Sequence, residues 1–238
     1  MTEINLLLFE YKIYSQNGED GITNKLIELI YTNKLNKYFV EFGVQNGSEC
    51  NTRILREKYN WNGLLMDGSY KNDNINLKKE WINRENIISL FKKYNVPKNI
   101  NLLSIDIDFN DFYCLREILP LYKCDIIICE YNAKHLPTDD KVIIYDINGS
   151  WDHSDYFGVS LLTLTKLANY YNYSLVCCCS RGVNAFFINN DIIKNKNLNF
   201  KNINNVSKIY KPMSESVLSG LKKDSKNRKY ITFEEAMK

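Results

Sequence analysis

Oxygen-bearing side chains follow two apolar runs of the sequence that have the character of buried strands. They are Asp106 and Asp108 after the first run, and Glu130 and Asn132 after the second. Because the ends of adjacent parallel strands lie side by side, we expect these side chains to converge. Such a ligand set suits a hard divalent cation such as Mg²⁺ or Mn²⁺. The alternative stays open, in which Asp108 caps the next helix and Glu130 only forms hydrogen bonds.

A second candidate site is the turn at residues 40–47, Val-Glu-Phe-Gly-Val-Gln-Asn-Gly. It ends an apolar run, where ligands of doubly wound sheets bind. Gly43 allows a sharp turn, and Gly47 allows backbone to approach a ligand closely. Gln45 and Ser48 stand where a dinucleotide GxGxxG motif would have its second and third glycines, which argues against a nicotinamide cofactor.

Asp67 ends the next apolar run, Gly63–Met66. A carboxylate at this position can accept hydrogen bonds from ribose hydroxyls. Its Asp-Gly-Ser context fits an ordinary turn equally well. Together with the turn at 40–47, at the spacing of one strand–helix–strand unit, it favours a nucleoside ligand.

Both histidines follow the acidic positions. A histidine near a strand end can remove a proton from an acceptor hydroxyl, and His135 is the better candidate because it closely follows Glu130. Asp152, His153 and Tyr156 lie in an acidic, aromatic stretch suited to gripping a polyol. A packed loop explains that stretch equally well.

Alternation of apolar runs and helical periodicity predicts the elements that position these residues. Helices are expected at Gly18–Tyr31, after Ser48 with Ile54, Leu55 and Tyr59 facing inward, at Arg84–Asn95 with Asn83 as N-cap, at Asp111–Leu119 and at Val159–Tyr171. Strands are expected at Tyr38–Phe42, Gly63–Met66, Glu80–Ile82, Asn101–Ile107, Cys124–Tyr131, Leu175–Cys179 and Ala185–Ile188.

This order predicts an α/β fold with a doubly wound, mostly parallel, Rossmann-like sheet and an antiparallel hairpin at one edge. The expected core spans residues 1–190, with a helical lead-in at 1–36. Residues 191–238 are polar and poorly patterned, so we expect an extension, and we expect the part after Lys222 to be dispensable for folding.

Composition excludes few functions. The net charge of +3 is too balanced to indicate nucleic acid. The basic run towards the C-terminus is typical of a solvated face. Seven cysteines without a CxxC pair favour reduced thiols in the cytoplasm over a zinc site. No signal peptide or membrane-spanning stretch is recognisable in the sequence.

Several segments together resemble class I S-adenosylmethionine-dependent methyltransferases, in particular the FkbM-like, sugar O-methyltransferase-like kind. They are Tyr14–Asp20, Glu41–Gly43, Leu103–Asp108, Cys129–Asn132, Asp155–Leu161 and Gly182–Phe187, so the resemblance runs from about Tyr14 to Ile188. Family members commonly have glycine after the Ile-Asp-Ile-Asp run, where this chain has Phe109.

The resemblance implies a seven-stranded sheet, S-adenosylmethionine as methyl donor and a sugar, glycan or other small polar acceptor, with Mg²⁺ or Mn²⁺ as a further cofactor. It implies that the donor contacts Gln16, Glu19, Glu41, Gly43, Gly47, Asp67, Asn83 and Asp106. In this interpretation Asp108 and His135 are catalytic. A non-catalytic nucleotide-binding module and a nucleic-acid methyltransferase remain alternatives, and a homo-oligomer stays open.

Overall fold

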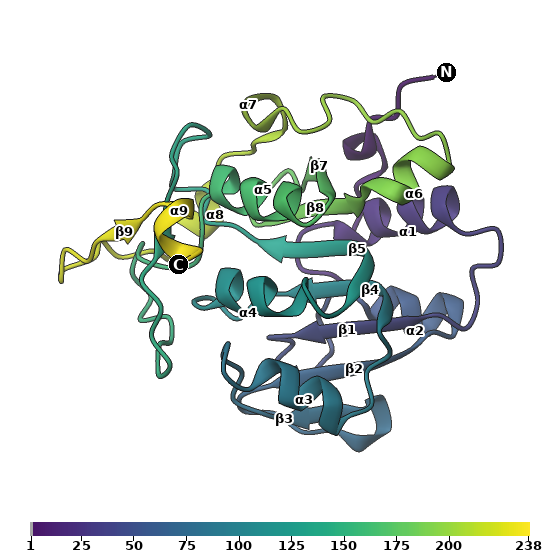
Figure 1. Cartoon of the computed structure of the whole chain (residues 1–238), viewed down its shortest axis with the longest axis horizontal. Helices are drawn as coiled ribbons and strands as arrows, with labels where there is room; N and C mark the ends of the chain where they lie inside the picture. Colours follow the sequence, from purple (N-terminus) through teal and green to yellow (C-terminus); the bar gives the residue numbers. More distant parts are fainter. Residues whose placement is uncertain (1) are drawn as a thin grey trace.

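The computed structural model describes residues 2–238, apart from the side chain of residue 217. Its centre is a seven-stranded sheet in the order β3-β2-β1-β4-β5-β8-β7 (Figure 1). These strands are β1 Tyr38–Phe42, β2 Asn62–Asp67, β3 Leu77–Lys79, β4 Asn99–Ile105, β5 Lys123–Glu130, β7 Tyr173–Cys178 and β8 Asn184–Asn189. Strands β1 to β5 pair in parallel, and β8 pairs antiparallel with both β5 and β7. The fold is therefore Rossmann-like, with the predicted antiparallel hairpin at one edge.

Helices cover both faces of this sheet. One face carries α3 Ile87–Lys93, α4 Asp111–Ile118 and α5 Leu161–Tyr170. The other carries α1 Glu19–Ile30, α2 Arg53–Tyr59 and the 3₁₀ turn η1 Leu6–Phe9. Within β1, Val40 and Phe42 pack on the first face and Phe39 on the second, because side chains alternate along a strand. Ile54, Leu55 and Tyr59 are buried as predicted.

Two predicted elements of the β2–α3 region are wrong. The third strand is Leu77–Lys79 rather than Glu80–Ile82. Only Leu77 of this short edge strand is fully buried, so the sequence carries no apolar run to reveal it. Helix α3 begins after Asn86 rather than after Asn83, because the two asparagine side chains each accept a hydrogen bond from the other's backbone N–H and form a turn before the helix.

The switch point of the sheet lies between β1 and β4. From β1 the chain winds outward through β2 to β3, then returns to place β4 on the other side of β1. The loops after these two central strands therefore diverge and leave room between them for a ligand. Figure 1 shows the arrowheads of the parallel strands β1 and β5 on the left, with the loop after β5 and the C-terminal segment beyond them.

The C-terminal residues dock on the core. They form the short elements α6 Asn190–Asn195, α7 Val206–Ile209, α8 Glu215–Leu218, β9 Tyr230–Ile231 and α9 Phe233–Ala236. Strand β9 pairs with β6 Val142–Ile143, in the loop after β5. The hydroxyl of Tyr156 donates to the carbonyl of Lys229 (3.0 Å), and Arg116 donates to the carbonyl of Ala236. These contacts show that the segment after Lys222 docks on the core, and whether it is dispensable for folding stays a prediction.

In the described part of the chain, no helix combines the length and apolar character needed to cross a membrane.

Candidate functional site

A two-lobed cleft lies at the carboxyl ends of the central strands. Its lobes have volumes of about 370 Å³ and 340 Å³, within the range of small-molecule sites. Both lobes are lined by Gly43, Gln45, Asp106, Asp108 and Trp151, so they meet at the switch point. We call the larger one, which also includes Glu130, the acidic lobe, and the smaller one, which includes Asp67, the β2 lobe.

The turn after β1 is held by Glu41. This buried carboxylate accepts hydrogen bonds from the backbone N–H groups of Asn51 (2.8 Å) and Thr52 (2.9 Å) and from the Thr52 hydroxyl (2.5 Å). Burial raises its pKa, while the hydrogen bonds from Thr52 and Asn51 oppose that rise. Glu41 lines the acidic lobe, but its main contacts fix the loop that leads into α2.

Gly43 brings the β1 and β4 loops into contact. It has a φ of +81°, and a Cβ at this position would lie 1.4 Å from the carbonyl oxygen of Asp106. No other residue type fits this close approach. Gly47 has a φ of +76°, but a Cβ there would meet the side chain of Ile75. Gly47 thus turns towards the apolar core, and it does not line either lobe.

Asp67 organises the β2 lobe through backbone contacts. One carboxylate oxygen accepts from the N–H of Gln45 (2.7 Å), and the other from the N–H groups of Ser69 (2.7 Å) and Tyr70 (3.2 Å). A carboxylate offers about four lone-pair directions, so at least one remains for a ligand hydroxyl. Asp67 therefore has the turn role and also lines the β2 lobe, and its contact with a ligand stays a prediction.

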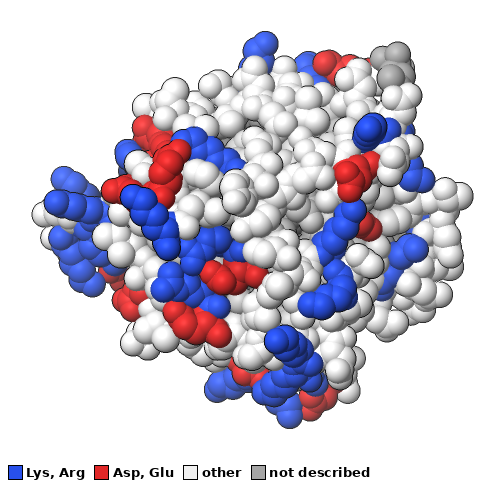
Figure 2. Space-filling model, viewed as in Figure 1, with Lys and Arg blue, Asp and Glu red and all other residues white. Residues whose placement is uncertain are grey.

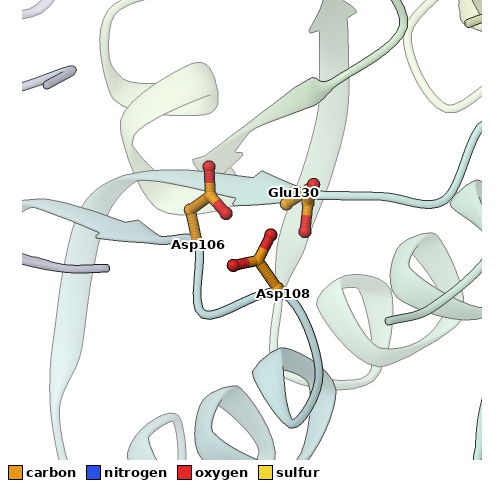
Figure 3. Close-up of side chains that lie close together, drawn as sticks. All are labelled: Asp106, Asp108 and Glu130. Carbon is orange, nitrogen blue, oxygen red and sulfur yellow. The ribbon is translucent and has the colours of Figure 1, made fainter. Parts of the chain in front are cut away.

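Three carboxylates converge in the acidic lobe. Asp106 and Asp108 follow β4 and Glu130 ends β5, and one oxygen of each lies within 4.8 Å of the others (Figure 3). Burial, reinforced by repulsion from the neighbouring carboxylates, raises the pKa of Asp106 and of Glu130 well above the usual range. The pKa of Asp108 is also raised by burial, although His153 opposes the rise.

One oxygen of this cluster lacks a partner. Glu130 Oε2 is buried and accepts no hydrogen bond from any described residue. Asp111, at the start of α4, adds a further buried carboxylate whose pKa is raised to about 7 by burial and by Asp108. The floor of the cleft thus concentrates carboxyl groups whose ionised forms a cationic ligand would favour.

Aromatic side chains and the C-terminal segment form the walls. Trp151 and Phe157 line the acidic lobe, and Trp81 and His153 line the β2 lobe. Trp151 packs against His153 with ring centroids 4.6 Å apart. Met213 and Leu221, from the C-terminal segment, also line the acidic lobe, so this segment is part of the site.

Several other residues of the predicted site line the cleft, and several do not. Gln16 lines the acidic lobe. Glu19 is buried beside it, where it accepts from the side chain of Asn184 (2.8 Å). Asn83 lies in the turn before α3 and does not line either lobe. Asn132 donates to the backbone carbonyls of Asp155 and Phe157, so its amide is committed to loop structure.

The remaining predicted residues are engaged in the loop after β5. His135 does not line either lobe. It packs edge-on against Tyr230 (4.5 Å between centroids), and burial lowers its pKa to about 4. Asp152 accepts hydrogen bonds from Arg228 and Ser154. The Tyr156 hydroxyl is hydrogen-bonded to backbone. Asp152 and His153 are exposed and Tyr156 is buried, and His153 lines the β2 lobe, so both interpretations of this stretch stay open.

Sequence reasoning missed several lining residues. Trp81 was assigned to a strand, and Met213 and Leu221 to an unpatterned extension. Asp111, which is buried and lines neither lobe, was noted only as a helix start, although a third aspartate so soon after Asp106 and Asp108 was a usable signal. No sequence signal marks Met213 or Leu221, because their place in the cleft depends on tertiary docking.

A scan against family models finds no match, and a search of the curated proteins finds none. A search of solved structures finds similarity to the citrinin polyketide synthase CMeT domain, with a TM-score of 0.40 and 9% identity. The match covers 72% of this chain and 51% of that chain, so this chain spans about half the length of that one. The Rossmann-like fold is therefore assigned from the strand order of the seven-stranded sheet.

Proposed function

We propose that this protein is an S-adenosylmethionine-dependent O-methyltransferase that acts on a hydroxyl of a sugar, glycan or other small polar acceptor. The observation that carries the proposal is the acidic two-lobed cleft at the switch point between β1 and β4. The resemblance of the sequence motifs to FkbM-like methyltransferases supports it, because the Glu41–Gly43 and Leu103–Asp108 segments border this cleft.

The charge of the cleft favours this donor. S-adenosylmethionine carries a sulfonium and an ammonium group, and the floor carries Asp106, Asp108 and Glu130. In the proposed arrangement the nucleoside lies in the β2 lobe, where Asp67 accepts from a ribose hydroxyl and Trp81 borders the base. The methionine part then lies near Gly43 and Asp106, where the two lobes meet.

The acidic lobe also fits a divalent cation. Three oxygens within 4.8 Å of one another suit Mg²⁺ or Mn²⁺, and the buried, unpartnered Oε2 of Glu130 lacks the compensation that a buried carboxylate needs. Asp106, Asp108 and Glu130 would hold the ion, and Asn132 is left out because it lines neither lobe and its Oδ1 accepts from the N–H of Lys134 (3.0 Å). A bound cation would lower the pKa of an acceptor hydroxyl.

In the proposed reaction the acceptor oxygen displaces sulfur at the methyl carbon, so a C–O bond forms, a C–S bond breaks and S-adenosylhomocysteine leaves. The chain's own contribution is alignment and removal of the hydroxyl proton. Asp108 is the candidate base, because it borders both lobes and its pKa is raised. His135 does not line the cleft and is dropped from this role.

The decisive experiment combines calorimetry with a turnover assay. We expect S-adenosylmethionine to bind with an affinity in the micromolar range, about −7 to −8 kcal/mol, and S-adenosylhomocysteine to form when sugar acceptors are added. Asp108→Asn should reduce turnover about 100-fold or more and weaken donor binding much less. Donor binding without turnover on any acceptor would favour the non-catalytic module, and preferential binding of a nicotinamide dinucleotide would reject the proposal.

A further inference from the structure

The segment at residues 221–229 concentrates positive charge beside the cleft. It contains Lys222, Lys223, Lys226, Arg228 and Lys229, and Asp224 is its acidic member. Figure 2 shows a blue projection at the left edge, on the side where Figure 1 places the loop before β9. This is the side of the molecule to which the parallel strands point their carboxyl ends.

Two of these cations are already engaged within the protein. Arg228 donates to both Asp152 (2.9 Å) and Asp224 (3.0 Å), and Lys226 lies 3.3 Å from Asp152. Lys222, Lys223 and Lys229 are exposed, and their ammonium groups form no ion pair with any described residue. We call these three lysines the basic rim.

Backbone hydrogen bonds fix the basic rim at the cleft. Leu221, immediately before it, lines the acidic lobe. The N–H of Lys222 donates to the carbonyl of His153 (2.9 Å), a residue that lines the β2 lobe, and the carbonyl of Lys222 accepts from the N–H of Asp155 (2.7 Å). Lys222 is therefore anchored beside a residue of each lobe, and the carbonyl of Lys229 accepts from the hydroxyl of Tyr156, while the three side chains stay available to a partner.

Charge is thus separated across the site, with carboxylates on the floor and free lysines at the rim. We infer that the acceptor is an anionic glycan, a sugar chain that carries carboxylate or phosphate groups; this inference rests on the proposed function. A cationic donor is attracted to the floor. An anionic acceptor is repelled by the floor and attracted by the rim, so its charged groups stay outside while a neutral hydroxyl enters.

The size of the basic rim favours a glycan over a nucleic acid. Specific nucleic-acid binding typically engages about 6–10 phosphates, whereas the rim offers three unpaired lysines and the whole chain has a net charge of only +3. The aromatic wall formed by Trp151 beside the acidic lobe also suits the apolar face of a sugar ring.

The test compares fluorescently labelled probes by anisotropy at low and at physiological salt. The probes are a short oligogalacturonate, a glycerol-phosphate oligomer of matched charge, a neutral malto-oligosaccharide and a single-stranded oligonucleotide of matched charge. The rim variant is Lys222→Gln/Lys223→Gln/Lys229→Gln. Its control is Lys92→Gln/Lys194→Gln/Lys196→Gln, which changes the net charge equally at exposed lysines outside both lobes.

We expect at least one anionic glycan probe to bind about tenfold more tightly than the neutral one. The rim variant should bind that probe about tenfold more weakly than the parent does, as the loss of three exposed ion pairs allows. The affinity of the control variant for the same probe should stay within about twofold of that of the parent. The two anionic probes tell carboxylate from phosphate. Equal binding by the rim variant and the parent, or preference for the neutral probe or the oligonucleotide, overturns the inference. Calorimetry with S-adenosylmethionine on the same proteins separates the two ideas: rim-dependent glycan binding without donor binding refutes the proposed function alone.

Discussion

Replacement of Asp111 by asparagine should stabilise the metal-free protein at neutral pH. One oxygen of Asp111 accepts from the N–H of Ile107 (2.8 Å), and the other is buried without a partner. Burial, with repulsion from Asp108, raises its pKa from 3.8 to about 7. Asparagine keeps the acceptor for Ile107 and removes the ionisable group.

The sign and size of the effect follow from proton linkage. Below about pH 3.8 Asp111 is protonated whether the chain is folded or unfolded, so it adds no pH dependence. As pH rises towards 7, the unfolded chain ionises while the folded protein holds its proton, and each pH unit lowers the free energy of unfolding by about 1.4 kcal/mol. The contribution of Asp111 should therefore lower the free energy of unfolding of the parent by about 2 kcal/mol at about pH 5.5 and by about 4 kcal/mol at about pH 7. Above that pH the effect should reach a plateau. Asparagine forgoes a favourable charge at the start of α4, a loss of about 0.5 kcal/mol.

Urea unfolding in the presence of a chelator, at several pH values between 4 and 8, measures this difference. The two proteins should have similar stability at the acidic end and diverge as pH rises, with Asp111→Asn the more stable. A matched control is Asp191→Asn, an exposed carboxylate whose pKa is lowered by hydrogen bonds from Lys123 and Asn172. That control should lose stability relative to the parent as pH rises above the acidic range. Parallel curves for parent and Asp111→Asn, or a less stable variant at neutral pH, would refute the reasoning.

Three further perturbations probe the site. Gly43→Ala should lower the free energy of unfolding by at least about 3 kcal/mol and abolish ligand binding, because the new Cβ would meet the carbonyl of Asp106. Urea unfolding and calorimetry measure these two effects, and a well-folded variant that binds normally would contradict the geometry. Mg²⁺ or Mn²⁺ should raise the melting temperature of the parent but not of Glu130→Gln, as scanning fluorimetry can show, and equal shifts would place the ion elsewhere. Truncation after Lys222 should lower the melting temperature by several degrees, since it removes β9 and the contact of Arg116 with the C-terminal helix. An unchanged melting temperature would show that these contacts contribute little to stability.

Apolar patterning was sufficient to predict the central sheet. The strand at Tyr38–Phe42 was predicted with its observed bounds, and those at Asn99–Ile105 and Lys123–Glu130 within two residues. Buried parallel strands are continuous apolar runs, which a single sequence displays directly. The edge strand Leu77–Lys79 was not predicted, because one buried leucine does not form an apolar run.

The predicted convergence of side chains is confirmed where the residues follow directly from strand ends. Asp106, Asp108 and Glu130 converge as expected, because parallel strands fix where their carboxyl ends lie. Asn132 and His135 lie beyond the strand, where local hydrogen bonds of the loop decide side-chain direction. Sequence spacing carries no information about those bonds.

The C-terminal segment shows a further limit of patterning. Its docking depends on tyrosine hydroxyls and backbone groups, such as Tyr230 Oη donating to the carbonyl of Asp155 (2.8 Å) and the N–H of Asp224 donating to the Asp155 carboxylate (2.8 Å). Such contacts leave a polar sequence without apolar periodicity. They nevertheless place Leu221 against the cleft, so a segment that resembles a tail is part of the site.

The stability and metal experiments constrain each other, because both measure the charge of one cluster. Burial, reinforced by repulsion from neighbouring carboxylates, raises the pKa of Asp106, Asp111 and Glu130 in the folded protein, so the cluster opposes folding at neutral pH when no cation is bound. A divalent ion would remove the same repulsion that Asp111→Asn removes in part. The stabilisation by metal should therefore grow with pH in the parent and be smaller in Asp111→Asn. If Asp111→Asn stabilises the protein and metal does not, the cluster repels but does not bind a metal. The positive charge of the donor then becomes the remaining candidate to balance it.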